Sequence, residues 1–226
     1  MTGIRFVLKG LSDTFENLVY FLLMTLAWWL AIAIFPFAPA ATMALFVHAD
    51  PRHGSSSDRL TWSETLHYIR TNFIKGWLLA LATIPFLGLF AFNFFYYGNS
   101  TNFLGILTPL WFVLFFFGFG TTATAFSHAA LTELPIKRSL RTALLMTGAR
   151  LPVVIPMLLF LVAVNLFGAF LVIPLAMFIP MTNAAVFNRF VLASLKINIV
   201  DPLEPTPERL AEGKEPRRFF PGRRKH

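Results

Sequence analysis

The stretch that decides the fold runs from Gly76 to Leu131 and reads GWLLALATIPFLGLFAFNFFYYGNSTNFLGILTPLWFVLFFFGFGTTATAFSHAAL. These 56 residues include no Lys, Arg, Asp or Glu, and one polar, turn-forming patch at residues 97–102 interrupts them near the middle. A hydrocarbon core of about 30 Å takes roughly 20 helical residues to cross, and a chain in lipid must satisfy its own backbone hydrogen bonds. The stretch therefore predicts a transmembrane helical hairpin, with helices over about 76–97 and 103–130.

The composition of the whole chain agrees with an integral membrane protein. Of its 226 residues 56% are apolar, 27 are Phe and only 13% are charged, whereas a soluble domain is about one quarter charged. The net charge of +8 comes from basic residues that flank apolar segments, which is typical of membrane topology and of contact with anionic lipid headgroups. Because no basic and aromatic binding module is present, we expect no nucleic-acid partner. The chain has no Cys, which excludes disulfides and thiolate metal sites.

Two further uncharged stretches lie on either side of this hairpin. Residues 17–49 form the first predicted span, in which Pro36 and Pro39 should produce a kink. We expect one tilted, kinked helix here rather than a tight hairpin, because about 10 residues after Pro39 are too few to cross back. Residues 152–195 are long enough for two helices with a turn near residues 165–168, although a single long span stays open.

The polar segments between the spans predict two amphipathic helices at the membrane interface. Thr61 and Glu64 have the spacing of a capping box, and apolar residues recur at helical spacing over residues 61–75. The same pattern returns over residues 135–150. Residues 1–200 are thus predicted to form one transmembrane helical domain. Residues 201–226, which are rich in Pro and charge, are predicted to be a disordered basic cytoplasmic tail.

The distribution of basic residues predicts the topology. Segment 50–75 has four, segment 132–151 has four and the chain from residue 189 has nine, whereas the 98–102 loop has none. If the basic segments are cytoplasmic, about five spans are required and the N-terminus lies outside, a placement that Arg5 and Lys9 oppose.

A weak internal likeness predicts a repeat. Phe46-Val47-His48-Ala49 resembles Phe126-Ser127-His128-Ala129, and Ile69-Arg70-Thr71 resembles Leu140-Arg141-Thr142. This pattern indicates a parallel repeat of span, interfacial helix and span, although the identities are few enough for chance to stay open. The expected fold is an all-α polytopic bundle of about five spans and two interfacial helices.

Few residues are candidates for a functional site. His48 and His128 end two spans at matching positions and could form a proton or metal site, but an interfacial imidazole is also simply amphipathic. Arg70 and Arg141 could bind an anionic headgroup or substrate, or only set the topology. The Asn residues in or beside apolar spans could line a pathway or hydrogen-bond between helices; they are Asn93, Asn165, Asn183 and Asn188. Arg189, in the polar last helix, is a further candidate. We find no catalytic motif, and we expect no cofactor and no metal.

Three stretches resemble the YesL-like family of bacterial integral membrane proteins, a family of unknown function. Phe35-Pro36-Phe37-Ala38-Pro39-Ala40-Ala41-Thr42-Met43-Ala44-Leu45 is similar to its Pro and Pro-Ala-x-x-Ala-Leu signature, and Tyr68–Trp77 to its Phe-x-x-Asn-Phe-Lys stretch. Asn183–Phe190 is similar to its C-terminal end. The likeness covers about residues 6–196. It implies a multi-pass protein of the bacterial inner membrane, in some members associated with carbohydrate uptake, and it supplies no catalytic residues.

Three functional hypotheses follow. The favoured one is a non-enzymatic accessory or assembly factor that contacts another membrane complex, since small residues at the inner end of the third span permit close helix packing. The second is a small transporter or permease component, suggested by the repeat and the intramembrane Asn residues. The third is a lipid-modifying membrane enzyme, which would need His, Arg and Glu133 clustered at one interface. Expected partners are anionic lipid headgroups and a membrane protein or a second copy of the chain.

Overall fold

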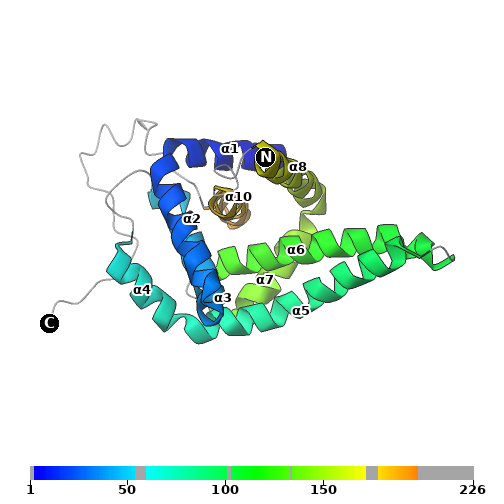
Figure 1. Cartoon of the computed structure of the whole chain (residues 1–226), viewed down its shortest axis with the longest axis horizontal. Coiled ribbons are helices and arrows are strands. Elements are labelled where there is room, and N and C mark those ends of the chain that lie inside the picture. The colour runs from blue at the N-terminus through cyan, green and yellow to red at the C-terminus, as the bar shows by residue number, and fades with distance from the viewer. Residues whose placement is uncertain (1–2, 54–59, 101–102, 133, 172–177, 198–226) are drawn as a thin grey trace.

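The computed structural model describes residues 3–53, 60–100, 103–132, 134–171 and 178–197, and within these ranges the chain is helical without any β-strand. The helices are α1 (Gly3–Glu16), α2 (Leu18–Ala33), α3 (Ala38–His48), α4 (Trp62–Thr71), α5 (Phe73–Gly98), α6 (Thr108–Leu131), α7 (Ile136–Ala149), α8 (Leu151–Leu171) and α10 (Ile179–Ser194) (Figure 1). Short 3-10 helices cover Phe35–Phe37, Pro51–His53 and Phe103–Leu107. The predicted all-α class is therefore confirmed, whereas the predicted tail lies outside the described residues.

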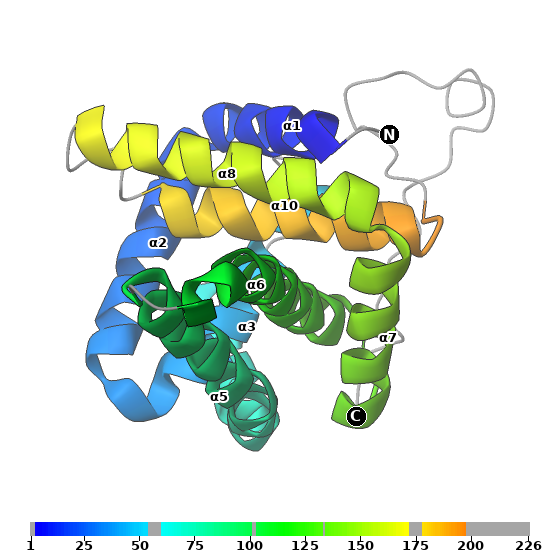
Figure 2. The ribbon, with the colours of Figure 1, turned by 90° about the vertical axis from the view of Figure 1, so that its right-hand side faces the viewer.

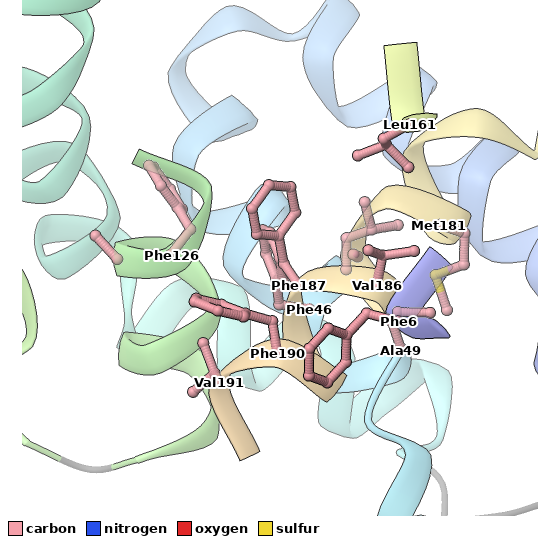
Figure 3. Packing of buried hydrophobic residues seen from close by; sticks show 14 of the residues in the cluster. Phe6, Phe46, Ala49, Phe126, Leu161, Met181, Val186, Phe187, Phe190 and Val191 are labelled. Atoms are coloured by element: carbon pink, nitrogen blue, oxygen red, sulfur yellow. The ribbon is translucent and has the colours of Figure 1, made fainter. Parts of the chain in front are cut away.

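The hydrophobic core lies where α3, α6 and α10 pack against one another. Side chains from all three helices, joined by Phe6 of α1, fill it (Figure 3). The rings of Phe6 and Phe190 pack edge to face with their centroids 5.9 Å apart, a favourable arrangement for aromatic pairs. In Figure 2, α5 and α6 point nearly along the view, α8 and α10 run across it, and α2 and α7 run up the page. The outer helices thus leave this core in different directions.

The predicted hairpin over residues 76–130 is present as α5 and α6, with its turn after Gly98. Both are long and apolar enough to cross a membrane, because the continuous apolar segments Phe73–Gly98 and Phe103–Leu131 have 26 and 29 residues. At 1.5 Å per residue, α5 is about 39 Å long. The hairpin projects beyond the rest of the molecule (Figure 1). The two central spans of the prediction are therefore present as helices of spanning length.

The expectation of one kinked helix over residues 17–49 is wrong, because α2 and α3 form a tight antiparallel hairpin. The indole nitrogen of Trp28 donates to Thr42 Oγ1 over 3.1 Å. Farther from the turn, the Tyr20 hydroxyl is bonded to His48 Nδ1. The reversal occurs at Phe35–Phe37, where Pro36 has no N–H to continue a helix. With 16 and 11 residues, these helices extend only about 24 and 16 Å, so the hairpin is too short to cross a bilayer and return.

Two sharp bends connect amphipathic helices to apolar ones. The axes of α1 and α2 differ by 97°, and those of α7 and α8 by 92°. If each bent pair is one broken span, the described residues contain up to four spans, and the five-span count is not confirmed. The two predicted amphipathic helices are present as α4 and α7, and the capping box of Thr61 and Glu64 forms as expected. Helix α1 is a third amphipathic helix that the sequence analysis missed.

The C-terminal apolar stretch folds as two helices, but the predicted turn near residues 165–168 is wrong, because these residues lie inside α8. The connection to α10 falls at residues 172–177, outside the described residues. The two Arg residues matched in the proposed repeat take different positions, since Arg70 lies in the last turn of α4 and Arg141 in the first half of α7. The repeat therefore stays a prediction. The likeness that still supports it is that His48 and His128 both lie in the last turn of a helix.

Candidate functional site

The polar residues of the core gather near the C-terminal ends of α3, α6 and α10, a region that we call the polar junction. At its centre Asn188 of α10 is completely buried. Its Nδ2 atom donates to the Phe46 carbonyl oxygen over 2.7 Å, and its Oδ1 accepts from the Ser127 hydroxyl over 2.7 Å. The side-chain amide thus serves α3 as a donor and α6 as an acceptor, and it ties all three central helices together.

His48 occupies the α3 side of the polar junction and is 5% exposed. Its Nε2 atom lies 3.0 Å from the Thr65 hydroxyl, which already donates its only proton to the Thr61 carbonyl oxygen. Nε2 must therefore carry the ring proton and donate to Thr65, so that in the neutral ring Nδ1 accepts from the Tyr20 hydroxyl at 2.5 Å. These bonds join α3 to α2 and α4 and use both ring nitrogens.

His128 lies at the α6 side and is 1% exposed. Its Nδ1 atom is 3.3 Å from the Thr132 hydroxyl, which itself donates to the His128 carbonyl oxygen over 2.7 Å. The Lys75 ammonium donates to the neighbouring Ala129 carbonyl oxygen over 3.1 Å, a favourable place for a cation at a helix C-terminus. The His48 ring thus contacts Tyr20 and Thr65, whereas the His128 ring contacts Thr132. Within the described ranges no three His, Cys, Asp or Glu residues are grouped to hold a metal.

Arg189 of α10 forms a bidentate ion pair with Asp13 of α1, through its Nε and one terminal nitrogen. The side chains are only 12% and 15% exposed, so the two charges must neutralise each other. The predicted candidates Arg70 and Arg141 are exposed on α4 and α7 and lie outside the junction. Asn183 is half-buried, and its Oδ1 atom is buried without a hydrogen-bond partner.

Tyr68 on α4 packs against the core, and its burial raises the pKa of the phenol above the ordinary value of 10.0. Desolvation disfavours the phenolate, so this side chain stays neutral throughout the physiological range. It contributes apolar surface to the α4 side of the junction and supplies no charge there.

Sequence reasoning identified His48, His128 and Arg189 but missed what they bind. His48 bonds to Tyr20 and Thr65, and Arg189 pairs with Asp13, all of which lie in other helices. The sequence does contain a signal for one of these partners. Asp13 is an acidic residue next to an apolar stretch, and such residues are usually paired with an opposite charge. The sequence places Asn188 within an apolar span, but only the structure shows that it lies at the centre of the core. Chemically, the junction holds helices together through bonds that occupy its donors and acceptors.

Comparison with known proteins gives no match, since no family model matches the chain and neither a curated protein nor a solved structure is significantly similar to it. Function must therefore be argued from the residues and their arrangement.

Proposed function

We propose that this chain is a non-enzymatic multi-pass membrane protein that acts as an accessory or assembly factor by contacting another membrane complex. The observation that carries the proposal is the projecting α5–α6 hairpin. In the most apolar 18 residues of α5, only 17% of the residues are buried inside the protein, and in the corresponding part of Phe103–Leu131 only 6% are. Most residues of these two segments are therefore at least partly open to lipid or to helices of another protein.

The outer half of the hairpin has a surface suited to packing against a helix of another protein within a membrane. Large apolar side chains project from it, among them Phe92 and Phe95 on α5, which are 66% and 65% exposed. Gly88 lies between them and the core, and a Cβ atom added there would meet nothing within 4 Å. The open glycine permits close approach of another helix, which would then pack against the bulky side chains beside it. A partner helix seated here would bury apolar and aromatic surface without disturbing the core.

The polar junction supports a scaffold role, since His48, Asn188 and Arg189 are each engaged by a neighbouring helix. A reactive group would need an open donor or acceptor directed at a substrate. The junction instead holds the three central helices in a fixed arrangement, from which α5 and α6 extend.

We propose further that the protein resides in the bacterial inner membrane, with its basic loops and tail in the cytoplasm, as the YesL-like resemblance and the positive-inside rule suggest. A repeat relating α3–α4–α5 to α6–α7–α8 is part of this proposal. Two like contacts support it, because Gly76 of α5 packs on Ala40 of α3, and Gly120 of α6 packs on Val154 of α8. The α2–α3 hairpin, however, removes the single first crossing on which the five-span count depended.

Site-specific photo-crosslinking tests the accessory role. A photoreactive residue at Phe92 should form a discrete protein adduct in native membranes, whereas the same group at buried Leu79 should form none. Mass spectrometry of the adduct identifies the partner. If Phe92 forms only lipid adducts, and the protein purifies from mild detergent without a stoichiometric partner, the accessory role is wrong.

The second candidate function, a small transporter or permease component that could be carbohydrate-related, has one observation in its favour. Hydroxyl groups of Thr124, Ser139 and Thr147 are buried between α6 and α7 without hydrogen-bond partners. Unpaired buried hydroxyls cost free energy, and a polar solute would satisfy them. Sugar uptake into vesicles holding the purified protein tests this role, with the triple valine and alanine replacement T124V/S139A/T147V as the matched control. Equal uptake by both proteins would contradict it.

A further inference from the structure

Helix α1 has three distinct faces. The inward face packs on α8 and α10 through Gly3, Phe6, Val7, Gly10 and Thr14, all of them buried. A second face is apolar and exposed, with Ile4, Leu8 and Phe15 at 44%, 53% and 68% exposure. A third face carries Arg5 and Lys9, with Ser12 and Glu16 beyond them. An exposed apolar stripe with cations along one edge is typical of a helix lying in the membrane interface.

The inward face fixes α1 firmly to the rest of the protein. Gly3 and Gly10 allow close approach, because an added Cβ atom would lie 2.2 Å from the Val153 carbonyl oxygen and 2.5 Å from the Val186 side chain. The ion pair of Asp13 with Arg189 locks the other end of the helix. The exposed stripe is therefore held in one orientation, and its apolar surface needs another partner.

One end of α1 lies beside the basic junction between α7 and α8. Its first described residue, Gly3, packs on Val153, close to Arg150 at the junction of α7 and α8. The 97° bend after Glu16 turns α2 away from α1, as the 92° bend turns α8 away from α7. Helices α1 and α7 are thus each followed by an apolar helix after a bend of about a right angle. Like α1, α7 combines exposed Leu144 and Leu145 with nearby basic residues.

The sequence supports the same placement. All 19 Lys and Arg residues lie outside the three uncharged stretches 17–49, 76–131 and 152–188. Because α2 and α3 form a returning pair, as α5 and α6 do, the chain comes back to its starting face after each of the first two stretches. Arg5 and Lys9 then lie on the same face as the other basic segments. A single first crossing would place Arg5 and Lys9 outside, against the positive-inside rule. The returning pair removes this conflict.

We propose that α1 docks in the plane of the anionic cytoplasmic leaflet, with Ile4, Leu8 and Phe15 inserted among the acyl chains and Arg5 and Lys9 on lipid phosphates. The N-terminus then lies on the same side of the membrane as α4 and α7. This inference rests on the proposed membrane location, and it identifies an anionic lipid surface as the partner of α1. Apolar burial supplies the anchoring, and the two cations supply the preference for anionic lipid.

The first test asks on which side of the membrane α1 lies. Because the chain has no Cys, a single introduced cysteine is the only thiol that can be labelled. Ser12→Cys on α1, Ser63→Cys on α4 and Asn99→Cys in the α5–α6 turn are all at exposed positions. A membrane-impermeant maleimide should label the first two from the cytoplasmic side and the third only from the opposite side. Labelling of Ser12→Cys from the side of Asn99→Cys would overturn the inference alone. Labelling of Ser63→Cys and Asn99→Cys from one side would instead overturn the proposed spanning hairpin.

Lipid contact is tested with an environment-sensitive fluorophore on Leu8→Cys, with Ser12→Cys as the matched control on the neighbouring polar face. In vesicles of phosphatidylcholine and phosphatidylglycerol, the Leu8 probe should shift to the blue and be quenched by lipids spin-labelled on the acyl chain. The Ser12 probe should do neither. R5Q/K9Q should remove most of the extra quenching that phosphatidylglycerol gives over phosphatidylcholine alone. A Leu8 probe that no lipid quenches, or whose shift depends on protein concentration, would overturn the inference in favour of a protein contact.

Discussion

Asn188 on α10 donates a 2.7 Å hydrogen bond to the backbone carbonyl oxygen of Phe46 on α3, across 142 residues of sequence. Replacing it by Ala leaves that carbonyl and the Ser127 hydroxyl without their partner inside the core. An unsatisfied buried polar group costs about 1–3 kcal/mol, so we expect N188A to lower the thermal unfolding midpoint in detergent clearly. N93A is the control, because the Asn93 side chain donates to the Leu89 carbonyl oxygen of its own helix. Equal effects of the two changes would contradict a central role for Asn188.

The ion pair of Asp13 and Arg189 gives a second prediction. Removing either residue breaks the ion pair of a mostly buried charge, at a cost of about 3 kcal/mol. D13A and R189A should each destabilise the protein, and D13A/R189A should cost much less than the sum of the single changes. R189K should restore only part of the stability, because an ammonium cannot form the paired bonds of a guanidinium. Chemical unfolding of the four variants measures these differences, and additive single effects would show that the pair is not coupled.

Two glycines of α5 provide a matched pair. A Cβ atom at Gly76 would lie 2.8 Å from the Ala40 backbone nitrogen, whereas at Gly88 it would meet nothing within 4 Å. G76A should therefore destabilise the contact between α5 and α3, by about 1–3 kcal/mol as overpacking usually does. G88A should be neutral or stabilising by up to about 1 kcal/mol, since Ala favours helix more than Gly does. Unfolding midpoints of both variants in the same detergent check this, and a loss for G88A would contradict it.

Much of the α5–α6 hairpin could be predicted from the sequence, because a long run without charge has few structures available in lipid. The turn at Phe35–Phe37 could not be predicted, since a proline in an apolar stretch is compatible with either a kink or a reversal. What decides between them is non-local. The indole nitrogen of Trp77 donates to the Pro36 carbonyl oxygen over 2.8 Å, which satisfies an acceptor that a helix would otherwise use.

The candidate site was predictable to a similar extent. The matching positions of His48 and His128 at helix ends are visible in the sequence, because both end an uncharged stretch. The bonding partners of His48 depend on how α2 and α4 pack against α3, and single-sequence periodicity contains no such information. Helix α1, by contrast, could have been predicted as an amphipathic helix, since apolar residues recur there at helical spacing, namely Ile4, Leu8, Leu11 and Phe15.

Burial of Tyr68 predicts a loss of stability in alkaline solution. Because its pKa is raised above 10.0 in the folded protein, the folded state holds this proton more tightly than the unfolded chain does. Its contribution is complete below about pH 10 and is lost as the pH rises further. Relative to the parent protein, Y68F should show a smaller decrease in unfolding midpoint between about pH 8 and about pH 11. The control is Y96F on exposed Tyr96, and identical pH profiles for Y68F and the parent would refute the prediction.

Cross-linking of α2 to α3 tests the chain reversal. The Trp28 indole nitrogen lies 3.1 Å from Thr42 Oγ1, whereas 14 residues of continuous helix would separate the two positions by about 21 Å. W28C/T42C should therefore react within one molecule with a short bifunctional thiol reagent, in a chain that has no other Cys. The control W29C/T42C should react far less, because the exposed Trp29 side chain lies on another face of α2. Mass spectrometry of the digested protein detects the bridge. Its absence in W28C/T42C would restore the single kinked helix and, with it, an N-terminus on the opposite side of the membrane.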